Sequence, residues 1–237
     1  MRVPHVVVDA RGPSITLAPA VDRHLRRVLR LRDGACVSVT DGRGGAADAV
    51  LTPGGLEVGT WSTKPEPPRV VLWAAIGKGS RFDLVVEKAT ELGVASIRPL
   101  VCSRGEQREA KLRRWDAIAR SAVEQSRGRW LPEVCEPVDL TTALRAAKGV
   151  VLHPGARGGA TLVMRLQPSH IAVGPEGGFT EPEIEAAFDA GWTVCGLGPR
   201  VLRTETAAVV AAALAVAASG GLDAQDPQER RSKTSDG

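Results

Sequence analysis

Beyond residue 68 the chain alternates short apolar runs with amphipathic segments, and this alternation constrains its fold more than any other feature. Val70–Ile76 is an unbroken apolar run, which is typical of a strand buried on both faces. Further strands are predicted at 96–101, 150–152, 171–173 and 193–197, and helices at 82–92, 109–126, 180–190 and 205–218. Strands that alternate with helices predict an α/β domain with a mainly parallel sheet.

The residues before this region follow a different pattern. Val6–Val8, Cys36–Thr40 and Leu56–Val58 are strand-like, and glycine-containing turn sequences separate them. A proline-rich stretch at 64–68 predicts a linker. Residues 222–237 are polar and charged, and we predict a disordered tail there because they have nothing to bury. The sequence therefore divides into 1–68, 69–221 and 222–237.

The composition excludes several classes of protein. No stretch approaches the ~20 apolar residues that span a bilayer, and the N-terminus lacks the apolar core of a signal peptide. The cysteines lie far apart without a C-x-x-C pair, which argues against a zinc site and a disulfide framework. We therefore expect no membrane partner, no metal and a cytoplasmic location.

The positive charge is mostly arginine, which supplies 25 of the 31 Lys and Arg residues in a chain of net charge +4. A helical arrangement of residues 21–32 separates two kinds of side chain. One side is apolar: Val21, Leu25, Val28 and Leu29. The opposite side is basic: Arg23, Arg26, Arg27 and Arg30. A stripe of one sign favours phosphate contacts, because a solvated face usually mixes both signs.

A second basic group stands at Arg127-Gly128-Arg129-Trp130. Its indole ring is able to stack on a base, and it fits equally well in a protein core. The sequence leaves both interpretations open.

Three predicted strands end in unusual sequences, at Leu152–Gly155, Gly174–Phe179 and Leu197–Thr206. Ligands of parallel sheets bind beyond the carboxyl ends of the strands. The three glycines of the second segment allow a ligand to approach the main chain closely, although a tight turn before a capped helix also explains them. Arg200 and Arg203 precede a helix N-terminus, where cations are unfavourable, and this indicates a role beyond capping.

Familiar nucleotide and hydrolase motifs are absent. The chain contains no G-x-x-x-x-G-K-[ST], no complete G-x-G-x-x-G and no G-x-S-x-G. His153 stands at a strand end beside glycines, but a lone histidine is more often structural than catalytic.

Taken together, these segments resemble the 16S ribosomal RNA uridine-N3 methyltransferases (the RsmE family) of the SPOUT class. The resemblance covers nearly the whole chain up to about residue 220, and GPEGG and LGPRVLRTETA are its most specific segments. The matching residues are 24–30, 78–79, 87–93, 124–126, 152–154, 174–178 and 197–207. Two places depart from the family pattern: Gly155 stands where an arginine is common, and 102–108 replaces a loop rich in Arg, Ser and Cys.

The resemblance implies a SPOUT α/β domain with a C-terminal trefoil knot, preceded by a small PUA-like β-barrel that binds RNA. It also implies a homodimer, S-adenosyl-L-methionine as cofactor, and 16S rRNA or the small ribosomal subunit as partner. The implied activity is methylation of uridine N3 in 16S rRNA. One alternative is a SPOUT methyltransferase that acts on another rRNA or tRNA position. A second is a non-catalytic RNA-binding ribosome assembly factor.

The same resemblance assigns roles to three sets of residues. The cofactor-binding set is Leu152, His153, Gly174, Pro175, Glu176, Gly177, Gly178, Leu197, Gly198, Val201, Leu202, Thr204 and Thr206. The RNA-binding set is Arg23, Arg26, Arg27, Arg30, Lys78, Lys88, Arg127, Arg129 and Arg200. The catalytic set is Arg203, which would stabilise negative charge on the uracil, and Glu205, which would orient Arg203 or accept the N3 proton.

Overall fold

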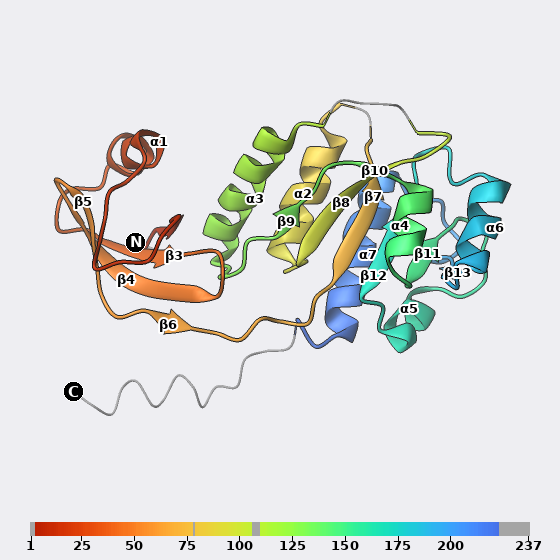
Figure 1. The fold of residues 1–237 in the computed structure, drawn as a ribbon. Helices are drawn as coiled ribbons and strands as arrows, with labels where there is room; N and C mark the ends of the chain where they lie inside the picture. Colours follow the sequence, from red (N-terminus) through yellow and green to blue (C-terminus); the bar gives the residue numbers. More distant parts are fainter. Residues whose placement is uncertain (1–2, 78, 106–109, 223–237) are drawn as a thin grey trace.

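A computed structural model describes residues 3–77, 79–105 and 110–222 (Figure 1). In these residues the strands form two separate sheets, one N-terminal and one C-terminal. Residues 64–70, which connect the two sheets, contain no helix or strand. The predicted helix start at residue 109 and the predicted tail from residue 223 onward lie outside the described residues.

The N-terminal sheet is built mainly from antiparallel neighbours. Its order is β1 (His5–Val7), β3 (Cys36–Thr40), β4 (Gly45–Thr52), β5 (Gly55–Val58) and β2 (Ser14–Ile15), and β6 (Ser62–Thr63) pairs with β4. Among the described pairings of this N-terminal sheet, only that of β1 with β3 is parallel. Strand β4 was not predicted, because glycine, alanine and aspartate have low strand propensity. Its pairing with β3 and β5 on either side makes it a strand.

The predicted basic helix is only partly formed. Helix α1 (Pro19–Arg23) passes into a π-helical turn, η1 (His24–Val28), and Arg30 has a left-handed backbone with φ of 56°. A π-helical turn is wider than an α-helical turn, so the 3.6-residue spacing fails after Arg23. Leu25 is fully buried, but Val28 is 64% exposed. The prediction of one apolar side and one continuous arginine stripe is therefore wrong.

The C-terminal sheet is parallel throughout its described pairings, as predicted. Its order is β10 (Val138–Asp139), β8 (Ser96–Val101), β7 (Val71–Ala75), β12 (His170–Val173), β11 (Val150–Leu152) and β13 (Thr193–Cys195), and β9 (Glu133–Val134) pairs with β8. Each predicted apolar run of this region is a strand. The strands β12, β11 and β13, whose carboxyl ends carry the unusual sequences, are immediate neighbours.

Helices cover both faces of this sheet (Figure 1). One face packs against α2 (Arg81–Glu91), α3 (Leu112–Ser126), α5 (Ala160–Leu166) and α7 (Thr204–Ala218). The other packs against α4 (Leu140–Ala146) and α6 (Glu181–Asp189). Both faces are covered because both are apolar, as alternate side chains of β7 show. Leu72 and Ala74 face the first group of helices, and Val71 and Trp73 face the second. None of the helices in the described ranges is long and apolar enough to cross a membrane.

Helix α6 begins with the predicted capping box. The Glu183 N–H donates to Thr180 Oγ1 at 3.4 Å, and the Thr180 N–H donates to Glu183 Oε2 at 2.7 Å. We expect Thr180→Ala to lower the free energy of unfolding by about 1 kcal/mol, because an orphan N–H of the first turn loses its acceptor. Urea denaturation measures this change. Thr161→Ala, at an exposed position of α5, is the control, and equal stability of the two variants would contradict the assignment.

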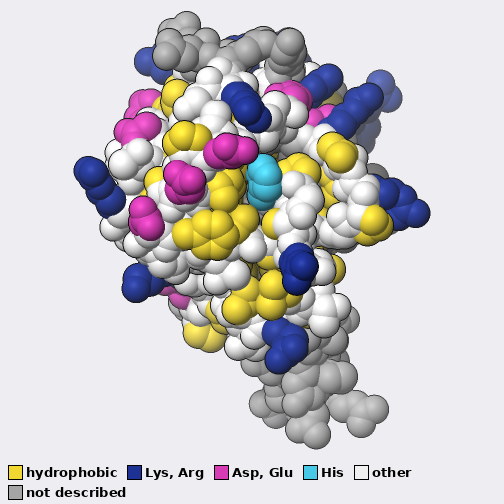
Figure 2. Space-filling model, turned by 90° about the vertical axis from the view of Figure 1, so that its right-hand side faces the viewer, with side chains coloured by type: hydrophobic (Ala, Val, Ile, Leu, Met, Phe, Trp, Pro, Cys, Tyr) yellow, Lys and Arg dark blue, Asp and Glu magenta, His cyan; other side chains and the backbone are white. Residues whose placement is uncertain are grey.

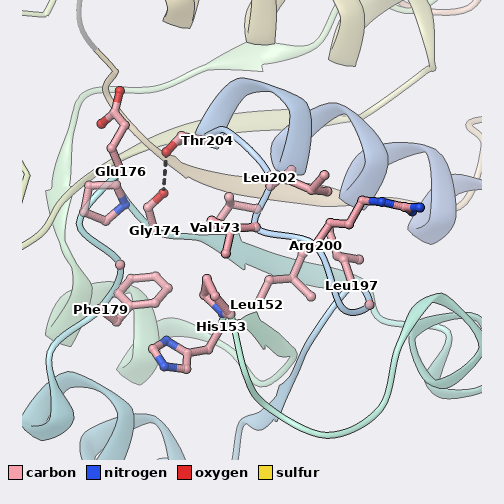
Figure 3. A pocket seen from close by; sticks show the side chains of 16 residues that line it. Leu152, His153, Val173, Gly174, Glu176, Phe179, Leu197, Arg200, Leu202 and Thr204 are labelled. Carbon is pink, nitrogen blue, oxygen red and sulfur yellow. Dashed lines mark hydrogen bonds between the residues drawn. The ribbon is translucent and has the colours of Figure 1, made fainter.

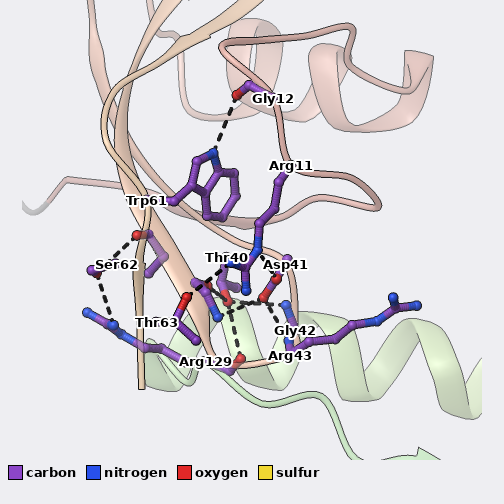
Figure 4. Close-up of polar contacts among 12 residues, drawn as sticks. Arg11, Gly12, Thr40, Asp41, Gly42, Arg43, Trp61, Ser62, Thr63 and Arg129 are labelled. Carbon is purple, nitrogen blue, oxygen red and sulfur yellow. Dashed lines mark hydrogen bonds and ion pairs between the residues drawn. The ribbon is translucent and has the colours of Figure 1, made fainter. Parts of the chain in front are cut away.

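A seam joins the N-terminal sheet to the segment that follows α3 (Figure 4). We define it as Gly42–Gly44 of the β3–β4 turn together with Arg129–Leu131. The Gly44 N–H donates to the Arg129 carbonyl at 2.8 Å, and the Leu131 N–H donates to the Gly42 carbonyl at 2.9 Å. The Thr40 hydroxyl also reaches the Arg129 carbonyl, at 3.3 Å. The two sheets are therefore connected by main-chain hydrogen bonds as well as by the linker.

Trp130 packs at this seam, and this packing favours a structural role over base stacking. A Cβ on Gly44 would lie 2.5 Å from the indole ring, so no larger residue fits there without a shift. Gly44 also has a φ of +89°, a conformation that favours glycine. Trp130 is half-buried between the two parts of the chain and is not displayed as a free stacking platform.

Candidate functional site

The unusual strand ends form one cavity at the carboxyl edge of the C-terminal sheet. The end of β11 contributes residues 152–154, the segment after β12 contributes 174–176, 178 and 179, and the segment after β13 contributes 197, 198, 200–202 and 204. These strands are neighbours in the order β12, β11, β13. The loops converge because parallel strands all end at the same edge of a sheet.

The cavity has an apolar interior and a polar main-chain surface (Figure 3). Leu152, Val173 and Leu202 face the same space, and Phe179 lies across from them. Figure 3 shows the side chain of Arg200 extending away from this space. The full set of lining residues is Leu152, His153, Pro154, Val173, Gly174, Pro175, Glu176, Gly178, Phe179, Leu197, Gly198, Arg200, Val201, Leu202, Thr204 and Ala207.

Hydrogen bonds hold the three loops against one another. The Thr204 hydroxyl donates to the Gly174 carbonyl at 3.2 Å, which ties the start of α7 to the glycine-rich loop. The His153 N–H donates to the Cys195 carbonyl at 2.9 Å. Phe179 packs against Gly174, where a Cβ would lie 3.0 Å from the ring. The cavity is therefore preformed by contacts within the chain.

Arg81, the first residue of α2, links two of the loops from outside the cavity. Its Nη1 lies 2.9 Å from Oε1 of Glu176, and its Nε lies 3.8 Å from Oε1 of Glu205. Glu205 is only 8% exposed, so its carboxylate depends on this cation. Arg81 was not predicted as a site residue, although it lies two residues after the 78–79 segment of the resemblance.

We expect Arg81→Ala to destabilise the protein by about 1–3 kcal/mol, because it leaves a buried carboxylate without a partner. Urea denaturation of the wild type and the variant measures this change. Adding Glu205→Gln to Arg81→Ala removes the buried charge and should restore part of the loss. An Arg81→Ala variant of wild-type stability would show that the Arg81–Glu205 pair contributes nothing.

Two buried polar atoms beside the three loops have no hydrogen-bond partner in the described residues. They are Nδ1 of His153 and Oε2 of Glu205. His153 lines the cavity, so its free nitrogen is available to a bound molecule. At Gly178, which has a φ of +70°, the nearest atom to an added Cβ is 4.0 Å away, so a ligand has room to approach the main chain. The cavity suits a ligand with a large apolar surface and a few hydrogen-bonding groups.

The thiols near the site are not nucleophiles. Burial, and secondarily the charge of Glu183, raises the pKa of Cys102 to about 12. Burial also raises the pKa of Cys195. Both thiols are therefore protonated at neutral pH, which excludes thiolate attack as the chemistry of this site. Within the described ranges, no group of three or more His, Cys, Asp or Glu side chains is placed to hold a metal ion.

Most of the predicted cofactor-binding residues line the cavity, but Gly177 and Thr206 do not. The Gly177 carbonyl accepts a hydrogen bond from Arg104 at 3.1 Å, and Thr206 is exposed on α7. Phe179 lines the cavity and was not predicted, although it directly follows the glycine-rich segment. Gly155 has a φ of +84°, a backbone conformation that favours glycine.

The expected pairing of Glu205 with Arg203 is wrong. Arg203 is the N-cap of α7 and is exposed, whereas Glu205 is buried and pairs with Arg81. The physical reason is that Arg203 has an extended backbone before the helix, whereas Glu205 lies in the first turn and is turned toward Arg81. Glu205 is also absent from the cavity wall, so we assign it a positioning role. Arg203 forms no ion pair with any residue that the structure describes.

The predicted RNA-binding residues fall into different environments. Arg26 is used internally, with ion pairs to Asp22 at 2.7 Å and Asp33 at 2.8 Å. Lys88 is similarly neutralised, by Glu87 and Glu91. Lys78 lies outside the described residues.

Arg127 and Arg129 both contact the N-terminal part of the chain. Arg127 donates to the Val3 carbonyl, and Arg129 donates to Ser62 Oγ at 3.2 Å. These contacts support the seam. Arg23, Arg27, Arg30 and Arg200 are exposed and form no ion pair with residues of the described ranges. Their contact with RNA stays a prediction.

The comparison with known proteins gives the class. The RNA methyltransferase domain model matches residues 64–216, and the RNA methyltransferase PUA domain model matches residues 23–58. Ribosomal RNA small subunit methyltransferase E of Synechocystis is 36% identical over 229 residues, covering 89% of this chain and 74% of that protein. The protein of the same name from Mycobacterium bovis is 35% identical over 216 residues, covering 79% of this chain and 80% of its own.

A solved structure agrees with this result. Ribosomal RNA small subunit methyltransferase E from Neisseria gonorrhoeae, bound to S-adenosyl methionine, superposes with a TM-score of 0.82 at 30% identity. The match covers 91% of this chain and 98% of that chain. A parallel sheet with three converging loops, matched over these lengths, defines an RNA methyltransferase. Within that class, the chain belongs to the ribosomal RNA small subunit methyltransferase E family.

The predicted family and the α/β fold with an N-terminal PUA domain are thus confirmed. The trefoil knot, the homodimer and the domain boundaries stay predictions of the resemblance.

Proposed function

We propose that the protein is an S-adenosylmethionine-dependent enzyme that methylates N3 of a uridine in 16S rRNA. The observation that carries the proposal is the cavity at the ends of β11, β12 and β13, in a family with a member solved bound to S-adenosyl methionine. When bound, S-adenosylmethionine supplies an activated methyl group. The residues present fit it, because the apolar side chains would contact the purine and the loop main chain and His153 would offer hydrogen bonds.

The work left to the protein is to position the uracil and to stabilise its charge. Uracil N3 carries a proton, which must leave before or during attack, so negative charge develops on the base. Arg203 is held between Leu202, which lines the cavity, and Thr204, which is bonded to Gly174. An unneutralised guanidinium at this point stabilises the developing anion. Holding the two reactants in the right geometry lowers the activation barrier by as much as ~7–11 kcal/mol.

The surface around this end of the molecule suits a nucleic acid. Figure 2 shows the side on which α6 lies in Figure 1. Hydrophobic side chains surround a histidine there, acidic side chains gather on one side of it, and Lys and Arg side chains stand around the margin. Cations at the margin contact phosphates, which leaves the centre for the base. The base has to be unpaired or flipped out to enter.

Mass spectrometry of 16S rRNA from a strain that lacks the gene tests the proposal. We expect one N3-methyluridine to be lost and to be restored by the wild-type gene. An unchanged modification profile would contradict an enzymatic role and favour an assembly factor. Loss of a different methylated nucleotide would assign the enzyme another target.

A further inference from the structure

A second cavity lies between the PUA domain and α3, far from the first. Its walls come from β1, from α1 and η1, and from α3. Its volume is about 430 Å³, within the ~300–1,000 Å³ range of small-molecule sites. In Figure 1, α1 lies at the opposite end of the molecule from α6 and β13, and α3 lies between them. The reaction at the first cavity does not use this one.

His5 lines the second cavity, and two hydrogen bonds hold its ring in place. Its Nε2 donates to the Gly128 carbonyl at 3.0 Å, and its Nδ1 accepts from the Ser38 hydroxyl at 3.1 Å. Burial, with the positive charges of Arg127 and Arg129, lowers the pKa of His5, so the ring is neutral. With both nitrogens occupied, the imidazole has only its ring surface to offer, and an aromatic base stacks on such a surface.

The polar groups in this cavity are suited to read the edge of a base. Glu124 Oε1 accepts from the Val7 N–H at 3.1 Å, while Oε2 has no hydrogen bond to a described residue. The side chains of Gln125, Ser121 and His24 line the same cavity and likewise make no hydrogen bond to the described part of the chain. A carboxylate accepts from an imino or amino group, and an amide both donates and accepts. These are the groups that an unpaired base exposes.

The charge around the cavity is suited to a polyanion. Arg23 precedes His24 in the chain and Arg27 follows it by three residues, and both are exposed without an ion pair to any residue of the described ranges. The apolar floor includes Leu25, which is fully buried, and Leu29, which is 40% exposed. A stacking wall, a polar edge and neighbouring free arginines together match a nucleotide better than an apolar peptide side chain.

We propose that this interdomain cavity binds one unpaired nucleobase of the RNA substrate, with Gln125 and Glu124 at its edge and Arg23 and Arg27 at its phosphates. The proposal rests on the proposed function, because it takes the ligand from the same rRNA. A base held between both domains fixes the register of the RNA on the enzyme. It would thereby position the target uridine at the distant methyl-transfer site.

Binding of full-length protein to a 16S rRNA transcript at fixed salt tests the proposal. Ser121→Trp places an indole in the cavity at an exposed position of α3. We expect it to weaken RNA binding at least about tenfold, comparable with the loss of one base-stacking contact. Its salt dependence should equal that of the wild type, because no phosphate contact is removed. By contrast, Arg23→Glu with Arg27→Glu should reduce the salt slope.

Thr141→Trp, at an exposed position of α4 on the other face of the sheet, is the control and should bind RNA normally. S-adenosylmethionine binding and thermal stability should be unchanged in Ser121→Trp, which excludes a folding defect. Wild-type RNA affinity of Ser121→Trp would overturn the proposal while leaving the proposed function intact. The proposal would also be overturned if Ser121→Trp bound the 16S rRNA transcript normally but bound assembled small subunits weakly. That result would assign the cavity to a side chain of a ribosomal protein. A wild-type protein that binds neither the 16S rRNA transcript nor the small ribosomal subunit would instead refute the proposed function.

Discussion

Replacing Arg203 with alanine is expected to abolish methyl transfer while leaving cofactor binding intact. Arg203 is exposed between Leu202 and Thr204, which line the cavity, has an extended backbone with φ of −65° and ψ of 152°, and is not neutralised by any described acid. We expect its positive charge to stabilise the anion that develops on the uracil and to contribute nothing to the binding of S-adenosylmethionine. Removing one such stabilising group costs about 10²- to 10³-fold in turnover.

Single-turnover assays with 16S rRNA measure the rate, and calorimetry with S-adenosylmethionine measures the affinity. Arg145→Ala, at an exposed position of α4, is the matched control and should behave as the wild type. Normal turnover of Arg203→Ala would remove Arg203 from the catalytic set. Loss of S-adenosylmethionine binding in that variant would assign it to the cofactor instead.

Replacing Gly178 with valine is expected to weaken S-adenosylmethionine binding strongly. Gly178 has a φ of +70°, where a β-branched residue is strained, and its Cα faces open space beside His153. The substitution would therefore move the glycine-rich loop and place a side chain in the cavity. We expect calorimetry to show an affinity loss of at least about tenfold, which is ~1.4 kcal/mol.

Gly93→Val is the control that separates backbone strain from obstruction of the cavity. Gly93 has a φ of +85° and no neighbour within 4 Å of an added Cβ, but it lies after α2, away from the cavity. Both variants should lose a similar amount of thermal stability, because both carry the same backbone strain. If Gly178→Val binds S-adenosylmethionine as tightly as Gly93→Val does, the loop does not contact the cofactor.

The sheet and the cavity were predictable because they depend on local signals. Apolar runs such as Val150–Leu152 form the strands of this parallel sheet. The residues that follow each run therefore lie together at the carboxyl edge of the sheet. The capping box at Thr180 is likewise a local pattern. Strand β4 has no such signal, because alanine and glycine become a strand there only through the neighbouring strands.

The roles of individual arginines were less predictable, because they depend on partners distant in sequence. Arg26 belongs to a basic segment, yet its guanidinium is held by Asp33 and by the Thr52 carbonyl. Arg129 contacts Ser62, 67 residues away. Arg81 became visible as a link between Glu176 and Glu205 only once three separate segments were brought together. Charge patterns therefore indicated a basic surface without showing which cations are free.

A crystal structure of the protein with S-adenosylmethionine tests the central claim most directly. The account predicts that the adenosine lies among Leu152, Gly174–Gly178 and Leu197–Leu202, with the methyl group directed toward the opening at Arg203. A donor bound elsewhere, or no binding at concentrations that saturate the Neisseria gonorrhoeae relative, would contradict it.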